Sequence, residues 1–210
     1  MTLSQQAYSV IEDMIISEAI PAGSYITEPE LVERTGLGRT PIREALQRLS
    51  HEHMVNIRPR RGIYVPSLEY ETELRILEVR RELDVVAVRL AAKRASNEQR
   101  DEMRALAAEL QQIGADLSTY AESIRETHQL LAAATKNTYL VESLLPLQNL
   151  SRRYWISNIV DAEHEIRISS DCHRRMLSGA AEKDSDSAEK AAYDLNDYLV
   201  DYATRAAQMS

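Results

Sequence analysis

Two short helices joined by a very tight turn are predicted near the N-terminus of this chain. Thr27 and Glu30 form a Thr-x-x-Glu capping box, so a helix begins at this point. Gly36 suits the left-handed backbone that commonly ends a helix, which leaves room for only about two turns. A second helix follows at once, with Gly38 or Thr40 as its N-cap. So short a connection makes the two helices cross steeply, which is the geometry of a helix-turn-helix.

A longer helix before this pair and a hairpin after it complete the pattern. Apolar residues recur at helical spacing over residues 5–19, and a Pro-Ala-Gly sequence follows them. Residues 55–58 and 63–65 alternate in the manner of two short strands, joined by Pro-Arg-Arg-Gly. This order of elements predicts a winged helix-turn-helix over residues 1–66.

The charge of the chain is unevenly distributed. The formal net charge of −8, taken alone, argues against nucleic-acid binding, because DNA attracts cationic surfaces. Residues 34–61, however, hold seven arginines and two acidic residues, whereas residues 67–210 hold 18 basic and 25 acidic side chains. A short basic stretch ahead of an acidic remainder indicates a head that contacts DNA on an acidic body.

The basic side chains fall where a winged helix-turn-helix contacts DNA. Arg39 and Arg43 are four residues apart, so they project from one face near the start of their helix and can reach guanine edges or phosphates. The alternative is a solvated basic helix in an ordinary bundle. We favour DNA binding because the charge, the tight turn and the hairpin coincide. The predicted DNA contacts are Arg39, Thr40, Arg43 and Gln47 on the helix, with Arg58, Arg60, Arg61 and Gly62 on the hairpin.

The chain beyond Pro66 shows no strand pattern. Six amphipathic stretches with short polar connections predict an antiparallel helical bundle. They span residues 69–95, 97–113, 116–135, 138–160, 162–180 and 185–207. We therefore predict a mainly α protein with a winged helix-turn-helix domain at 1–66, a linker at 67–70 and an all-helical domain at 71–210.

The remaining composition favours a cytoplasmic protein. Cys172 is the only cysteine, so no internal disulfide can form and a reducing compartment fits the chain. The N-terminus lacks the charged start and apolar core of a signal peptide. No apolar run approaches the roughly 18 residues that a membrane span needs. We expect no membrane partner.

These motifs resemble the GntR family of bacterial regulators. The likeness is carried above all by Gly-Arg-Thr-Pro-Ile-Arg-Glu-Ala-Leu-Gln-Arg-Leu at residues 38–49, and also by residues 20–23, 30–31 and 59–65. Gly38 departs from the family, which usually has Ser there. Glycine is an acceptable N-cap that costs only a few tenths of a kcal/mol.

The second part of the chain resembles the FadR-type (FCD) effector domain. The likeness lies in Arg-Arg-Glu-Leu-Asp at residues 80–84 and Leu-Ala-Ala at residues 90–92, and six helices look like the VanR-type branch. The resemblance implies a homodimeric repressor that binds a palindromic operator in double-stranded DNA. It also implies a small-molecule effector, a carboxylate by family analogy, held in the dimerising helical domain.

The resemblance places a metal ion in the effector pocket of many relatives. They hold it through an Asp, a His four residues later and two further His. His128 and His173 match two of these positions, but Ile124 stands at the Asp and Tyr198 at the last His. Two His without a carboxylate fall short of the three or four ligands of a protein metal site. In a different register, Asn196 or Asp197 replaces the last His.

We therefore predict that side chains hold the effector directly. Arg80 suits a carboxylate because its planar fork can donate two parallel hydrogen bonds, while His128, His173 and Tyr198 supply further ones. We predict no cofactor, and the alternative is a divalent metal bound by His128 and His173.

The competing function is a metal-binding or metal-responsive protein, or an enzyme, that uses His128 and His173. An enzyme of this kind needs a nucleophile, a base and an oxyanion site. Cys172 adjoins His173, but adjacent residues on a helix point to different faces. We predict no catalytic residues and a function other than catalysis.

Overall fold

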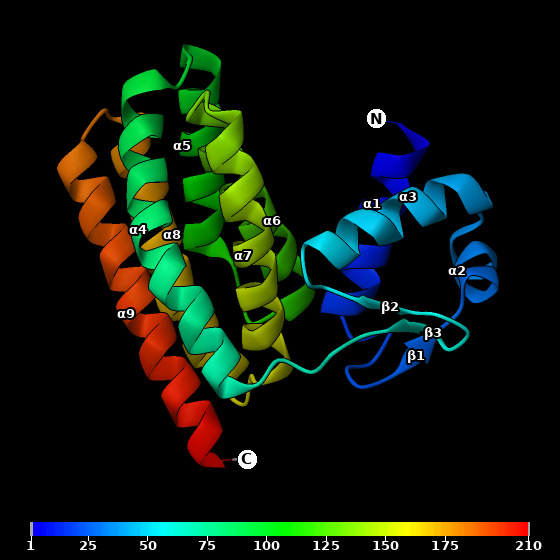
Figure 1. The fold of residues 1–210 in the computed structure, drawn as a ribbon. Coiled ribbons are helices and arrows are strands. Elements are labelled where there is room, and N and C mark those ends of the chain that lie inside the picture. The colour runs from blue at the N-terminus through cyan, green and yellow to red at the C-terminus, as the bar shows by residue number, and fades with distance from the viewer. Residues whose placement is uncertain (1, 210) are drawn as a thin grey trace. The chain divides into compact units, whose positions relative to one another are not determined.

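The structure is a computed structural model that describes residues 2–209. Its internal contacts divide the chain into two compact units, residues 1–69 and residues 70–210. Figure 1 traces the chain through the helices and strands of both units, which are described separately below.

The described residues of the first unit form three helices and a small antiparallel sheet. The helices are α1 (Leu3–Ile16), α2 (Glu28–Thr35) and α3 (Arg39–His51), and the strands are β1 (Tyr25–Ile26), β2 (Asn56–Arg58) and β3 (Gly62–Tyr64). The strand order is β1-β3-β2, with Ile63 of β3 opposite Ile26 of β1 and Ile57 of β2. The predicted winged helix-turn-helix is confirmed.

Helix α2 and the turn that joins it to α3 form as the sequence predicts. Thr27 Oγ1 accepts a hydrogen bond from the Glu30 backbone N–H at 3.4 Å, and the Glu30 carboxylate accepts one from the Thr27 N–H at 2.8 Å. Gly36 ends α2 in the left-handed conformation with φ of +69°. Gly38 is the N-cap of α3 and offers no side-chain hydrogen bond. The first-turn N–H groups of α3 therefore lack a side-chain cap.

Helix α1 differs from its predicted range at both ends. Thr2 opens a capping box that starts the helix earlier, at Leu3. The helix then ends at Ile16, because Glu18 adopts a left-handed conformation with φ of +58° and Ile20 turns inward to 2% exposure. Burial of Ile20 in the core thus ends the helix before the proline that follows.

The core of the first unit lies between α1 and α3. The two helices pack along each other, and their facing apolar side chains are at most 2% exposed. These side chains are Ala7, Ile11 and Ile15 of α1 and Ile42, Ala45, Leu46 and Leu49 of α3. The outer face of α3 is therefore left to polar residues, as the sequence predicts.

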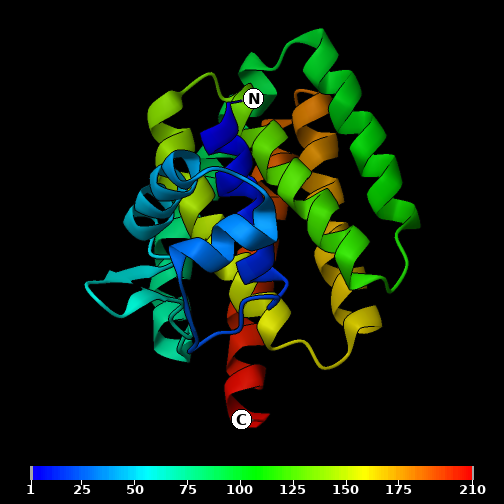
Figure 2. The ribbon, with the colours of Figure 1, turned by 90° about the vertical axis from the view of Figure 1, so that its right-hand side faces the viewer.

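Residues 70–209 of the second unit form six helices and contain no strand. They are α4 (Tyr70–Arg94), α5 (Asn97–Gln112), α6 (Leu117–Ala134), α7 (Thr138–Ser157), α8 (Ala162–Ala181) and α9 (Ser185–Met209). Helix α4 packs along α9 and α7, and α5 packs along α8, as Figures 1 and 2 show. The predicted mainly helical fold is confirmed.

Two features hold one end of this bundle together. At Gly179 a Cβ atom would lie 2.8 Å from the backbone nitrogen of Ala188, so α8 and α9 approach each other too closely there for a side chain. The buried Arg100 of α5 donates to carbonyl oxygens at two helix ends, at 2.9 to 3.2 Å. The acceptors are Ala92 of α4 and Ala180 and Ala181 of α8.

None of the helices in the described part of the chain combines the length and apolar character that crossing a membrane requires.

Candidate DNA-reading surface and buried polar cavity

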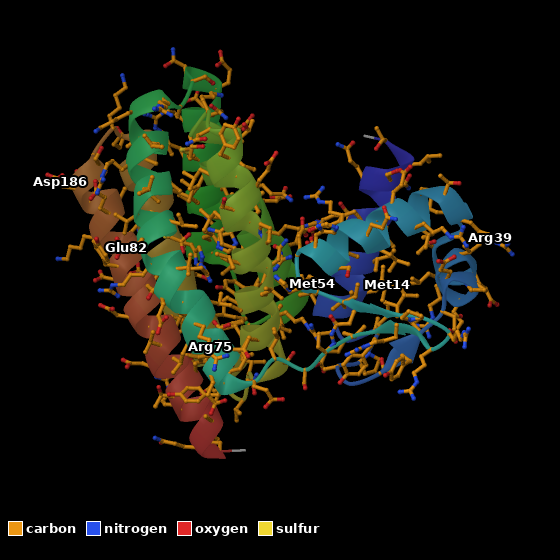
Figure 3. The ribbon with its side chains drawn as sticks, in the orientation of Figure 1. Met14, Arg39, Met54, Arg75, Glu82 and Asp186 are labelled. Carbon is orange, nitrogen blue, oxygen red and sulfur yellow. The ribbon has the colours of Figure 1, made fainter. Side chains whose placement is uncertain are left out.

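The outer face of α3 carries the predicted reading residues in an exposed row. Arg39 occupies the first position of the helix and projects into solvent, as Figure 3 shows. Thr40, Arg43 and Gln47 are also exposed. Because the N-terminus of α3 has no side-chain cap, its backbone N–H groups and positive dipole end favour an anion such as a phosphate.

Arg43 is held by an acidic residue of the neighbouring helix. Its Nε donates to Glu28 Oε2 at 2.7 Å, and the two side chains are 63% and 34% exposed. Arg43 and Glu28 are thus accessible to a bound macromolecule as a pair.

The hairpin between β2 and β3 presents three further arginines. Arg58 ends β2, and Arg60 stands in the turn with φ of +64°. Arg61 is exposed beside it. Gly62 has φ of +95°, and a Cβ atom there would lie 2.8 Å from the carbonyl oxygen of Ile26. The structure therefore gives Gly62 a backbone role, allowing β3 to pass close to β1.

A small cavity inside the second unit brings together three of the four predicted effector residues. Arg80 of α4, His128 of α6 and His173 of α8 line it, and its volume is about 30 Å³. Tyr198 is not among the lining residues. The others are Tyr120 and Ile124 of α6, Ser151, Arg152 and Trp155 of α7, Ser169 of α8 and Leu199 of α9.

The two histidines meet at the cavity with their rings tilted by 51° to each other. Their Nε2 atoms lie 3.2 Å apart, and His173 Nδ1 lies 2.8 Å from the carbonyl oxygen of Ser169. A carbonyl only accepts, so the proton of a neutral His173 sits on Nδ1 and its Nε2 accepts from His128 Nε2–H. His128 Nδ1 is then a buried acceptor that has no partner in residues 2–209.

Both histidines are poised to stay uncharged. Burial lowers the pKa of His173 to about 4, and the cationic Arg80 acts in the same direction. Burial also lowers the pKa of His128 well below its ordinary value, with additional contributions from His173, Arg80 and Arg152. Two uncharged imidazoles therefore share the cavity wall with Arg80 and Arg152.

The cation of Arg80 is anchored within the bundle. Its side chain is 2% exposed and its Nε donates to Asp84 Oδ2 at 3.1 Å, while Gln148 donates to the other oxygen of Asp84 at 2.6 Å. Arg152 also lines the cavity and donates to the carbonyl oxygen of Ala121 at 3.2 Å. These anchors fix where positive charge meets the cavity.

The lining residues do not fit a divalent metal. Ile124 lines the cavity one helical turn before His128, and α9 contributes Leu199, so neither helix supplies a third ligand there. Within residues 2–209 no three His, Cys, Asp or Glu side chains gather where they could hold a metal ion. Arg80 and Arg152 in the wall would also repel a cation.

Tyr198 instead belongs to a neighbouring hydrogen-bond network. Its hydroxyl donates to Glu165 at 2.7 Å and accepts from the indole N–H of Trp155 at 2.8 Å. Glu165 also accepts from Arg205 at 2.9 Å. Trp155 lines the cavity, so Tyr198 lies behind its wall, and Asn196 donates to the carbonyl oxygen of Leu77 instead.

Five polar or aromatic wall residues were not found by sequence reasoning. They are Tyr120, Ser151, Arg152, Trp155 and Ser169. Of these five, only Trp155 stands out in the sequence, because it is the single tryptophan of the chain. The others share ordinary amphipathic periodicity with residues that simply pack.

A winged helix-turn-helix with exposed arginines, followed by a helical unit around a buried polar cavity, defines a class of DNA-binding transcription regulators. Comparison with known families agrees with this. The family described as bacterial regulatory proteins, gntR family, matches residues 3–65, and the FCD domain matches residues 75–197. The chain belongs to the GntR family of transcription regulators and carries an FCD domain.

Individual relatives give the same assignment. The chain is 28% identical over 176 residues to the Nta operon transcriptional regulator of Aminobacter aminovorans, covering 82% of this chain and 81% of that one. It is 25% identical over 188 residues to the uncharacterized regulator YdhC of Bacillus subtilis, covering 88% and 84%. The solved structure of E. coli McbR/YncC superposes with a TM-score of 0.81 at 20% identity over the whole of both chains, which shows the shared fold.

Proposed function

We propose that this regulator is a cytoplasmic, ligand-responsive repressor that binds a palindromic operator as a homodimer. The observation that carries the proposal is the exposed row of Arg39 and Arg43 at the uncapped start of α3. A dimer seated on promoter DNA represses simply by excluding polymerase. In this proposal the DNA-binding domain comprises residues 1–66, and a linker at residues 67–70 connects it to the second domain. The second domain, residues 71–210, dimerises and binds the effector. The six helices of that part support a VanR-like, FadR-type assignment.

The effector is a small carboxylate held in the cavity. Arg80, together with His128 and His173, supplies a cation and polar ring nitrogens in a buried site. The present volume of about 30 Å³ suits a water molecule and no metabolite. The walls must therefore open when the effector enters, and this movement is how binding is communicated.

An apolar stripe on α4 supports dimerisation through the second unit. Val79, Leu83, Val86 and Leu90 follow a spacing of four, three and four residues, which places them on one side of the helix. Val79 is 48% exposed, and the other three are partly buried against Ala87, Leu140 and Leu144. A second copy would cover this stripe.

Selection of DNA from a randomised duplex library tests the reading function. Wild-type protein should enrich a short inverted repeat, and sedimentation should show two chains bound to it. Arg43→Ala should weaken binding by about 1–3 kcal/mol and relax preference at one base pair in each half-site. Enrichment of no sequence would contradict the proposal.

Sedimentation of a stripe variant tests the dimer. Val79→Glu places a charge in the exposed part of the stripe and should yield monomers, whereas Lys190→Glu on the exposed face of α9 should leave the dimer intact. A wild-type protein that is monomeric both in solution and on DNA would refute the dimer.

Thermal-shift measurements on metal-stripped protein test the effector. Lactate, succinate and citrate are compared, because a bound ligand stabilises the folded state. His128→Ala should abolish the shift while leaving operator affinity without effector intact. Near-stoichiometric zinc, nickel or manganese in untagged protein, lost in His128→Ala, would favour a metal-responsive regulator instead.

A further inference from the structure

Arginines on the DNA-reading surface differ in how they are held. In the described part of the chain, four of them make no side-chain hydrogen bond or ion pair. These are Arg39, Arg58, Arg60 and Arg61. Arg43 alone in this outward-facing set is tied to an acid, through the 2.7 Å contact between its Nε and Glu28 Oε2. A carboxylate inside a surface that binds a polyanion needs an explanation.

The role of Glu28 in its own helix is small, because its charge in the first turn of α2 only complements the positive end of the helix dipole. It is the first residue of α2, but the capping box of that helix uses Glu30. The ion pair is exposed, and pairs of this kind contribute little to folding stability. The contact is therefore poorly explained by stability and better explained by what it does to Arg43.

The geometry of the contact leaves the reading end of Arg43 free. Glu28 contacts the Nε edge of the guanidinium, so the two terminal nitrogens remain available as a fork. A fork of this kind donates in parallel to O6 and N7 of guanine. Holding the Nε edge also limits the rotamers that Arg43 loses on binding, which favours the oriented contact.

The charge of Glu28 also discriminates between two uses of Arg43. A phosphate is a full anion that is repelled by a neighbouring carboxylate, whereas a base edge in the groove is uncharged. We propose that Glu28 is a specificity-determining residue that presents Arg43 to a base edge and disfavours its use on phosphate. The inference rests on the proposed function, in which Arg43 reads DNA.

The test compares binding of two duplexes at fixed salt. One is the duplex selected from the randomised library by wild-type protein, and the other is a scrambled duplex of equal length. Glu28→Gln should raise affinity for the scrambled duplex and lower the ratio of the two affinities by about tenfold. A second selection with Glu28→Gln should show a flattened base preference at the position that Arg43→Ala also relaxes.

Glu33→Gln is the matched control. Glu33 is exposed on the same helix α2, and within residues 2–209 it has no hydrogen bond or ion pair with Arg43. Glu33→Gln removes the same charge, so it should raise affinity for both duplexes alike and preserve their ratio. In an Arg43→Ala background, Glu28→Gln should likewise leave the ratio unchanged, because the group that it orients is gone.

Two results separate the inference from the function beneath it. If Arg43→Ala keeps full discrimination, Arg43 does not read DNA and that part of the proposed function fails. If Arg43→Ala loses discrimination while Glu28→Gln behaves like Glu33→Gln, the reading function stands and the role of Glu28 is overturned. Circular dichroism and thermal melting establish that each variant is folded.

Discussion

His128 and His173 form a buried, neutral pair that makes the folding stability of the protein depend on pH. The pKa of His173 falls to about 4 in the folded chain, below its ordinary value of 6.5, so the unfolded chain takes up the proton first. The contribution of neutral His173 to folding is complete above about pH 6.5 and is lost as pH falls toward 4. We expect His173 to lower the free energy of unfolding by about 3 kcal/mol across this window, and the lowered pKa of His128 to add to this loss.

Chemical unfolding at a series of pH values measures this effect. His173→Asn should flatten the curve between pH 6.5 and 4, whereas His164→Asn, which alters an exposed histidine on the same helix, should follow the wild type. Parallel curves for His173→Asn and wild type would show that the imidazole is not buried in its neutral form.

Substitutions at two glycines with positive φ distinguish the cost of backbone strain from the cost of a steric clash. Gly36 has nothing within 4 Å of an added Cβ, so Gly36→Ala should cost only the conformational strain, about 1 kcal/mol. At Gly62 a Cβ would also meet the carbonyl oxygen of Ile26 at 2.8 Å. We expect Gly62→Ala to destabilise the first unit by about 2–3 kcal/mol and to weaken DNA binding through the displaced wing. Equal melting temperatures for the two variants would contradict this reasoning.

At the scale of elements, Arg100 is the clearest example of one side chain serving two helix ends. Arg100→Met removes the donor to three carbonyls near the ends of α4 and α8, and should cost about 2–4 kcal/mol. Arg104→Met lies on the same helix but breaks only exposed ion pairs, so it should cost less than about 1 kcal/mol. Denaturant unfolding of both variants checks the difference, and similar losses would show that the buried contacts are not the reason.

Elements whose ends carry their own local signal could be predicted from sequence. The capping box at Thr27 and the left-handed Gly36 define α2 without help from the rest of the chain. Strand β1 could not be predicted, because its two residues become a strand only by pairing with β3. Helix α1 ends early because Ile20 finds a place in the core, which is a tertiary effect.

The cavity shows the same limit at longer range. His128 and His173 are 45 residues apart, and only the family resemblance suggests that they meet. Periodicity along α9 cannot choose between neighbouring registers, and the structure turns Leu199 to the cavity while Tyr198 bonds Glu165 and Trp155. The assignment of effector residues stays a prediction for the binding experiments.

At the scale of the whole molecule, the separation of charge predicts how DNA binding responds to salt. In the proposed function the arginines of the wing contact the DNA backbone, and each phosphate contact contributes about −0.9 to the slope of log affinity against log salt. Because the proposed dimer carries two copies of the wing, Arg60→Ala should make the slope shallower by about 2. Lys183→Ala, in the acidic second unit, should leave it unchanged. Filter binding at several salt concentrations measures the slopes for both variants and wild type. Equal slopes for Arg60→Ala and wild type would exclude a phosphate contact by Arg60.

Trp155 is an intrinsic fluorescent probe in the wall of the cavity. It is the only tryptophan, its side chain is 4% exposed, and the ring of Tyr120 lies 5.2 Å from it in the same wall. Because the proposed effector can enter only if the cavity opens, the emission of this single indole should change in a saturable way during a citrate or succinate titration if either is the ligand. The signal comes from one defined position, so its titration curve reports occupancy directly, without a label and without DNA.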